Sequence, residues 1–404
     1  MTTKILVTGG AGFIGSEIVK QLSAHDEYEI RVLDALTKQI HGNNPEKSYL
    51  FQSIKDCCDF IRGDVRDFTT VQKALEGVDV VLHLAAETGT GRSMYMINQY
   101  SEVNVMGLSN IFQALSLKGK SNTIRKVILS SSRSVYGEGK YQCPNCGVVY
   151  PRGRKTKDMM QGDFTMHCDK CNTVLTLIPT TEDSKTTPNS LYAFTKLSQE
   201  MMIQTMCPAM DIDYTIFRFQ NVYGAGQSLK NPYTGILSIF SSLLLDNKDI
   251  NIFEDGKESR DFIHVKDVAS AVIKSINTAV SNGEIINLGS GIGTSVIEIA
   301  ETVKRIYGST SNLNVTGDFR IGDIAHNVAD TQKARKLLDF TPSISLQEAL
   351  DRALPYGRPA GGQETDKSVV TNNPLQSWNV QECLFESKYL EPWPKHNAIL
   401  LRPG

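Results

Sequence analysis

Short apolar runs alternate with longer amphipathic segments along the first half of the chain. The runs are bounded by glycine, aspartate or serine, which is typical of buried strands. Strands are predicted for residues 4–7, 29–34, 78–86 and 127–132. Helical spacing of apolar residues predicts a helix over 16–22 and longer helices near 96–118 and 189–206. Strands alternating with helices predict an α/β fold built on a doubly wound parallel sheet.

A glycine-rich turn follows the first predicted strand. Gly9 permits a tight turn, Gly12 lets the backbone approach a pyrophosphate, and Gly15 lets the helix pack closely on the strand. The free N–H groups of the helix start attract phosphate. An ordinary strand–turn–helix connection is the alternative, but the apolar strand before the turn and the helix after it favour a Rossmann-type dinucleotide site. The predicted cofactor residues of the turn are Gly9, Gly12, Phe13, Ile14 and Gly15.

Asp34 ends the second predicted strand, about 20 residues beyond the glycines. A carboxylate there accepts hydrogen bonds from both ribose hydroxyls of NAD and repels the 2′-phosphate of NADP. Residues 35–37 contain no arginine to bind that phosphate. The sequence therefore predicts NAD, although an aspartate ending a strand can also be a plain surface residue. Further cofactor contacts, to adenine and along the backbone, are predicted at Asp64, Val65, Ala85 and Ala86.

A serine run and a Tyr-x-x-x-Lys pair supply candidate chemistry. Tyr192 and Lys196 stand four residues apart in a predicted helix, which places them on one face. An ammonium group beside a phenol favours the phenolate, so Tyr192 can take a hydroxyl proton near neutral pH. Ser132, at the end of a strand, can hold the oxygen concerned. Ordinary amphipathic helices also contain such pairs. His83, on an apolar strand, is predicted to be a core histidine.

The charge balance limits the classes of partner. Lysine and arginine total 42 against 44 aspartates and glutamates, which gives no reason to expect nucleic acid or a membrane surface. No apolar stretch approaches the roughly 20 residues that cross a bilayer, and the first strand leaves no room for a signal peptide. We therefore expect a cytoplasmic protein with reduced thiols.

Together these motifs resemble the extended short-chain dehydrogenase/reductases of the nucleotide-sugar epimerase/dehydratase family, over most of residues 4–345. The resemblance implies that Ser132 is the catalytic hydroxyl, Tyr192 the base, and Lys196 also a ligand of the nicotinamide ribose. It implies that Asn104 supports the lysine through water within the cofactor site. Contacts to the nucleotide sugar are implied for Asn221, Arg260 and Arg320 at its phosphates, and for Glu87 and Thr88 beside its sugar ring.

The residues after the catalytic hydroxyl separate the reactions of this family. Dehydratases carry Asp-Glu there, whereas this chain has Arg133 and Ser134, so dehydration is not expected. Because Asp34 argues against a reductase that uses NADPH, the resemblance implies a 4-epimerase, in which hydride leaves C4 and returns to its other face. Segments 87–95 and 219–259 look most like those of dTDP-L-rhamnose 4-epimerases, which form dTDP-6-deoxy-L-talose. A UDP-hexose or UDP-uronate 4-epimerase, a decarboxylase and a catalytically idle NAD-binding scaffold stay open.

Two Cys-x-x-Cys pairs lie within residues 138–180, and they are Cys143 with Cys146 and Cys168 with Cys171. Their spacing is that of a tetrahedral four-thiolate zinc site, which is structural because no position is left for water. Four free thiols are the alternative, as is His167 in place of one cysteine. The segment is longer than in the plain family pattern, which implies an inserted zinc ribbon. A solvated hairpin tip explains its few basic residues better than nucleic-acid binding.

Three parts are predicted along the chain. They are an NAD-binding domain at 1–225 with the zinc ribbon inserted at 138–180, a nucleotide-sugar-binding part at 226–355, and a C-terminal extension at 356–404. Members of the family exchange segments between the first two parts, so a single boundary is approximate. The two longer helices resemble the pair that forms a four-helix interface in the family, which implies a homodimer.

Overall fold

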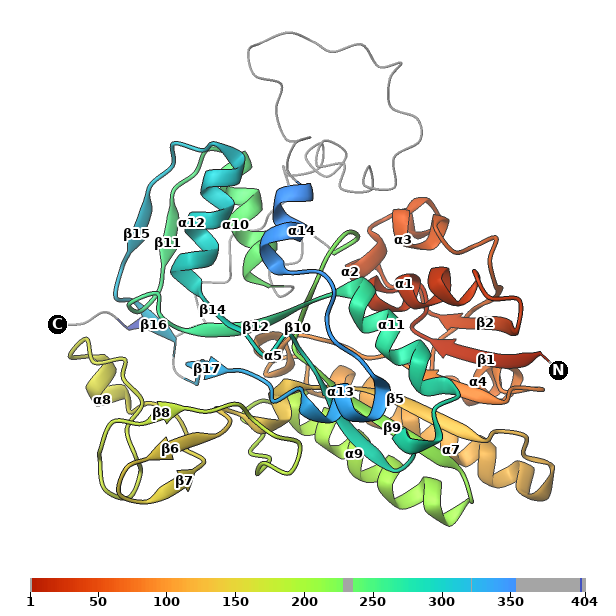
Figure 1. Ribbon diagram of the computed structural model, residues 1–404. Helices are drawn as coiled ribbons and strands as arrows, with labels where there is room; N and C mark the ends of the chain where they lie inside the picture. The colour runs from red at the N-terminus through yellow and green to blue at the C-terminus, as the bar shows by residue number, and fades with distance from the viewer. Residues whose placement is uncertain (1, 228–234, 321, 354–399, 402–404) are drawn as a thin grey trace, which may run out of the picture.

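A parallel sheet of seven strands forms the centre of the computed structural model, which describes residues 2–227, 235–320, 322–353 and 400–401 (Figure 1). The strand order is β3-β2-β1-β4-β5-β9-β13. The strands are β1 (Thr3–Thr8), β2 (Tyr28–Asp34), β3 (Asp59–Arg62), β4 (Val80–His83), β5 (Lys126–Ser132), β9 (Asp213–Phe219) and β13 (Glu284–Leu288). The order reverses between β1 and β4, which confirms the predicted doubly wound Rossmann sheet.

Alternate residues of the strands pack against different helices. Ile5 and Val7 belong to the core on one face of the sheet, and Leu6 belongs to the core on the other. The first face is covered by α1 (Phe13–Leu22), α11 (Val265–Ile276) and α13 (Gln332–Leu338). The second face is covered by α4 (Phe68–Ala74), α7 (Gly107–Lys118) and α9 (Leu191–Ala209). Burial on both faces explains why these strands are apolar without interruption.

The predicted elements agree with the structure except at two places. The run 78–86 forms a strand only over β4, because the chain beyond it turns into a loop above the sheet edge. The helix predicted near 96–118 consists of α6 (Ile97–Tyr100), a π-helical stretch η2 (Ser101–Met106) and α7 in succession. Short π-helical stretches inside helices are frequent at functional sites.

The cysteine-containing insertion is a small antiparallel sheet with the strand order β7-β6-β8. Its elements are β6 (Tyr141–Cys143), β7 (Gly147–Val149), α8 (Thr156–Met159) and β8 (Thr176–Leu177). Its core contains Tyr141, Met166 and Leu175 together with Ala325 from the later part of the chain. The insertion therefore packs against the smaller part of the molecule, as Figure 1 shows.

The smaller part has a separate apolar core, formed by α10 (Ile236–Leu245), α12 (Val296–Tyr307), α14 (Leu346–Ala353), β11 (Ile250–Ile252) and β12 (Ser259–His264). Strand β12 pairs with β10 (Asn221–Tyr223), β14 (Gly293–Ser295) and β17 (His326–Asn327). Strand β13, however, returns to the large sheet and pairs with β9, while α11 packs against α1. The chain thus passes between the two parts more than once.

Of the predicted C-terminal extension, only Leu400–Leu401 lies within the described residues, as β18, which pairs with β16 (Phe319–Arg320). The remaining short elements are α2 (Lys38–His41), η1 (Pro45–Lys47), α3 (Tyr49–Gln52), α5 (Thr90–Ser93), η3 (Gly119–Ser121), η4 (Arg133–Tyr136), η5 (Ala279–Ser281) and β15 (Leu313–Val315). Within the described ranges, no helix has the length and apolar character needed to cross a membrane.

Candidate active site

A cavity of about 2230 Å³ opens at the carboxyl ends of the sheet strands. Its volume is more than twice the roughly 1,000 Å³ of a large single-ligand site, so two ligands have room side by side. Every predicted cofactor, substrate and catalytic residue except Asn104 lines it. These residues are Gly9, Gly12, Phe13, Ile14, Gly15, Asp34, Asp64, Val65, Ala85, Ala86, Glu87, Thr88, Ser132, Tyr192, Lys196, Asn221, Arg260 and Arg320.

The glycine turn has no space for side chains. Gly9 has a φ of +72°, and a Cβ atom there would lie 2.7 Å from the backbone nitrogen of Ala85. A Cβ atom at Gly15 would lie 2.3 Å from the carbonyl oxygen of Gly9. Gly12 is the N-cap of α1 and supplies no capping side chain. The first N–H groups of α1 are therefore available to phosphate oxygens at the cavity wall.

Two acids at strand ends lie along the same wall. Asp34 accepts hydrogen bonds from the backbone N–H groups of Ala11 (2.9 Å) and Leu36 (2.8 Å). Burial raises the pKa of Asp34, and these two hydrogen bonds oppose that rise. Asp64 forms an ion pair with Arg66 at 2.8 Å. Both carboxylates are thus held in place where a dinucleotide would pass.

Tyr192 and Lys196 project from α9 toward the end of β5. The Lys196 ammonium donates to the carbonyl oxygen of Ser130 at 2.8 Å, and burial lowers the pKa of Lys196 to about 7. Burial raises the pKa of Tyr192, whereas the Ser132 hydroxyl and the positive charge of Arg133 oppose that rise. The structure therefore brings the predicted serine, tyrosine and lysine together at one end of the cavity.

Asn104 and Tyr100 hold the loop that carries Glu87 and Thr88. The Asn104 side chain accepts from the backbone N–H of Glu87 (2.7 Å) and donates to its carbonyl oxygen (3.1 Å). It also donates to the Thr195 hydroxyl (2.9 Å). The Tyr100 hydroxyl donates to the carbonyl oxygen of Thr88. Asn104 is fully buried behind the cavity, so its support of the lysine through water stays a prediction.

The predicted phosphate contacts come from three different strands. Asn221 on β10 donates to the backbone carbonyl oxygen of Asp261 at 3.0 Å. Arg260 on β12 donates to the carbonyl oxygen of Ala325 at 2.9 Å, and the Arg320 guanidinium lies 4.7 Å from the ring centre of Phe253. Both arginines line the cavity, which gives this end positive charge suited to a diphosphate.

Sequence reasoning missed four further residues around the reacting end. Tyr100 packs edge-on against the Tyr192 ring, with centroids 6.4 Å apart. Arg92 forms an ion pair with Glu87 at 3.0 Å, and Gln99 donates to the same carboxylate at 2.6 Å. Arg133 lines the cavity next to Ser132. No local pattern marks the first three residues, and the sequence distinguishes Arg133 only because it stands where dehydratases have an aspartate.

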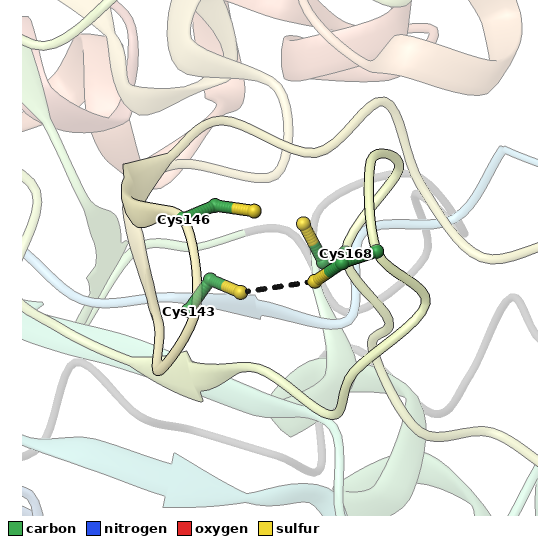
Figure 2. A group of neighbouring side chains, drawn as sticks. Cys143, Cys146 and Cys168 are labelled. Atoms are coloured by element: carbon green, nitrogen blue, oxygen red, sulfur yellow. Dashed lines mark hydrogen bonds between the residues drawn. The ribbon is translucent and has the colours of Figure 1, made fainter.

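The four predicted cysteines of the insertion lie together, with every pair of sulfur atoms within 4.8 Å. Figure 2 shows the cluster, in which the side chains of the labelled Cys143, Cys146 and Cys168 point toward a common centre. Zn–S bonds of about 2.3 Å place tetrahedral thiolates about 3.8 Å apart, so the cluster fits a metal with small adjustments. His167 instead bonds to the backbone carbonyl of Thr165 and is not one of this group.

His83 is a core histidine, as predicted. It is 1% exposed, and Nδ1 lies 2.8 Å from the Thr8 hydroxyl, while Nε2 lies 3.3 Å from the Gln199 amide nitrogen. An amide N–H can only donate, so His83 Nε2 is the acceptor and the ring is neutral. Burial accordingly lowers the pKa of His83 to about 3.

A glycine turn, an acidic strand end and a Ser–Tyr–Lys group that meet in one Rossmann cavity define an NAD-dependent enzyme of the extended short-chain dehydrogenase/reductase class. A model of the NAD dependent epimerase/dehydratase family matches residues 5–153 and 170–289, and the chain belongs to this family. The gap between the matched ranges falls inside the cysteine-containing insertion.

Relatives and solved structures of this family share most of the chain. The sequence is 36% identical over 352 residues to a dTDP-L-rhamnose 4-epimerase of Burkholderia thailandensis, covering 86% of this chain and 93% of the relative. The fold is similar to UDP-glucose 4-epimerase of Thermotoga maritima with UDP-glucose (TM-score 0.70, 26% identity, 88% and 98% of the chains). It is equally similar to a Bacillus cereus UDP-glucuronic acid 4-epimerase with UDP-glucuronic acid and NAD (TM-score 0.70, 26% identity, 88% and 99%).

Proposed function

We propose that the protein inverts the C4 configuration of a nucleotide sugar, and that its substrate pair is dTDP-L-rhamnose and dTDP-6-deoxy-L-talose. The observation that carries the reaction is the meeting of Ser132, Tyr192 and Lys196 in the cavity that the glycine turn also lines. The Burkholderia relative, at 36% identity over most of both chains, supports the choice of sugar and base.

Proton transfer in this proposal belongs to the side chains at the end of β5. The Ser132 hydroxyl holds the 4-oxygen of the sugar, and Tyr192 takes the 4-hydroxyl proton and later returns it. The Lys196 ammonium is anchored to the Ser130 carbonyl, which fixes its place one turn from Tyr192. When bound, NAD would supply reversible hydride acceptance, so that the hydride removed from C4 can return to the other face of the sugar.

The two ligands would lie side by side in the cavity and contact different parts of its wall. The first N–H groups of α1 would face the dinucleotide phosphates, and Asp34 would accept from the adenosine ribose hydroxyls, which excludes a 2′-phosphate. Arg260, Arg320 and Asn221 would hold the diphosphate of the sugar nucleotide. Glu87, held by Arg92 and Gln99, would lie beside the sugar ring.

Proton NMR with dTDP-L-rhamnose and purified protein tests the proposal. A second anomeric signal should grow to a constant ratio, and the same ratio should be reached from dTDP-6-deoxy-L-talose. Tyr192→Phe should abolish the exchange, whereas Tyr28→Phe, which loses only a surface hydrogen bond with Asn277, should not.

An unchanged spectrum, with or without added NAD, would contradict the proposed substrate. UDP-glucose and UDP-glucuronate would then be tried in the same tube. No exchange with any nucleotide sugar would favour the idle NAD-binding scaffold.

For the insertion, we propose a structural zinc ion held by Cys143, Cys146, Cys168 and Cys171. Four thiolates close the coordination sphere, so the ion would fold the insertion and take no part in the reaction. Metal analysis of protein purified without chelator should find about one zinc per chain. Absence of metal after reconstitution under reducing conditions would contradict this assignment.

A homodimer is proposed through the outer face of α7 and α9. Large apolar side chains are exposed there, with Phe194 at 56% and Met201 at 61% on α9 and Met106 at 54% beside α7. Sedimentation velocity should show a dimer, and Met201→Glu should shift it toward monomer. Val280→Glu, at an equally exposed site elsewhere, should leave the dimer intact.

A further inference from the structure

Arg133 is the first residue after Ser132, in the turn η4, and its side chain lines the cavity. No hydrogen bond or ion pair joins its guanidinium to the described residues, and its Nη1 atom is buried without a partner. A buried N–H group without an acceptor costs free energy, more so when it is charged. The neighbouring arginines of the cavity wall differ, because Arg66 and Arg92 each pair with a carboxylate and Arg260 donates to the carbonyl oxygen of Ala325.

The surroundings of Arg133 place it between the two ends of the substrate site. Its charged and titratable neighbours are Arg260, Asp323, Asp261 and Tyr192. Tyr192 belongs to the reacting end, and Arg260 belongs to the end suited to a diphosphate. The group that lies between C4 and the diphosphate of a nucleotide sugar is the sugar ring itself.

Arg133 also remains charged in this position. Burial and the nearby Arg260 lower its pKa, but only to about 10, so the guanidinium keeps its proton at neutral pH. A planar guanidinium with several N–H donors suits two neighbouring oxygen atoms. The hydroxyl oxygens of a hexose bound in the cavity are such acceptors.

We propose that Arg133 is a specificity-determining residue that binds hydroxyl oxygens of the sugar ring and holds a positive charge beside the Tyr192 hydroxyl. This inference rests on the proposed function and names the part of the substrate that the residue reads. The ionisable groups packed around Tyr192 are Arg133 from η4, Tyr100 from α6 and Lys196 from its own helix. Of these, Arg133 directly follows the catalytic Ser132 at the end of β5.

Calorimetric binding in the Tyr192→Phe background, with NAD bound, separates sugar contacts from turnover. Arg133→Gln should weaken dTDP-L-rhamnose binding roughly ten- to a hundredfold, the range for hydrogen bonds from a charged donor. It should leave dTDP binding unchanged, because dTDP lacks the rhamnose ring. Arg133→Lys should recover part of the loss. Arg125→Gln, at the opposite end of β5 and bonded to Asn277, is the matched control and should change neither affinity.

Two further measurements test whether Arg133→Gln still folds and whether the Arg133 charge acts on Tyr192. Thermal stability of Arg133→Gln should not fall, because the residue has no partner to lose. In the Tyr192-containing enzyme, the acid limb of the kcat–pH profile should move to higher pH in Arg133→Gln, because a nearby cation favours the phenolate.

Equal losses for dTDP and dTDP-L-rhamnose would place Arg133 on the diphosphate and overturn the inference, as would affinities within twofold of the parent. If the parent turns over dTDP-L-rhamnose while Arg133→Gln binds it normally, the proposed function stands and this inference fails. If the parent instead binds UDP-glucose or UDP-glucuronate, the proposed sugar fails. The comparison is then made against UDP, and Arg133→Gln must still lose affinity for the sugar nucleotide alone.

Discussion

The ion pair between Arg154 and Glu254 joins the cysteine-containing insertion to the smaller part of the molecule. Both side chains are 2% exposed. Arg154 also donates to the carbonyl oxygen of Asp323 at 3.0 Å, and the Asp323 carboxylate lies 3.6 Å from the Arg260 guanidinium. Arg154 therefore supports, through one intermediate residue, an arginine of the substrate site.

Replacing Arg154 with methionine should destabilise the protein by about 3–5 kcal/mol, because it leaves the Glu254 carboxylate buried without its partner. Changing Glu254 to glutamine as well removes that charge and should restore much of the loss. The double-mutant cycle therefore predicts strong non-additivity between two positions far apart in sequence. Arg152→Met, two residues earlier and exposed, should cost less than about 0.5 kcal/mol.

Urea unfolding at fixed pH, with metal content checked for each variant, measures these differences. Turnover should show a second effect: a KM for the nucleotide sugar raised severalfold in Arg154→Met, with NAD content unchanged, since only Arg260 loses support. The reasoning would be refuted if each single variant lost less than about 1 kcal/mol and the two losses added in the double variant. The coupling free energy between Arg154 and Glu254 would then be zero.

Three other perturbations have definite expected outcomes. Asp34→Ser should reduce NAD affinity roughly ten- to a hundredfold and reduce the preference for NAD over NADP, as measured by titrating cofactor-stripped protein. An unchanged ratio of the two affinities would mean that Asp34 does not bind the ribose. Cys146→Ser should abolish metal retention and lower thermal stability, while the exposed Cys57→Ser should do neither. His83 has a pKa of about 3 when folded against 6.5 as an ordinary histidine, so the unfolded chain binds the extra proton between these pH values. The free energy of unfolding should therefore fall as pH drops from 6.5 toward 3, by up to about 1.4 kcal/mol per pH unit, and His83→Gln should flatten that slope.

Local patterns predicted those parts of the site that depend on a few successive residues. The glycine turn is recognisable because Gly9 and Gly15 are required by contacts within one strand–turn–helix unit. Tyr192 and Lys196 share a helix face by virtue of their spacing alone. The cysteine pairs each occupy one tight turn, and their partnership follows from the four-ligand preference of zinc.

Local patterns do not predict contacts between segments that are far apart in the sequence. Nothing in the sequence around Arg154 indicates a partner 100 residues later. The support of Lys196 by Asn104 through water stays a prediction. The direct contacts of Asn104 with the backbone of Glu87 and with the Thr195 hydroxyl depend on the packing of η2 against α9, which no local pattern indicates. That the Arg133 guanidinium has no hydrogen-bond partner is likewise seen only in the folded cavity, because the local sequence does not show which groups surround a side chain.

The return of β13 to the large sheet has a practical consequence for producing this protein. A fragment ending near residue 225 would keep the glycine turn and the tyrosine but would leave the outer edge of β9 unpaired over Thr215–Phe219. It would also uncover the side of α1 that α11 protects. Open strand edges beside exposed apolar surface recruit other chains, so such a fragment should aggregate during expression. Cofactor-binding measurements, and the variants described above, should therefore use a chain that contains both parts.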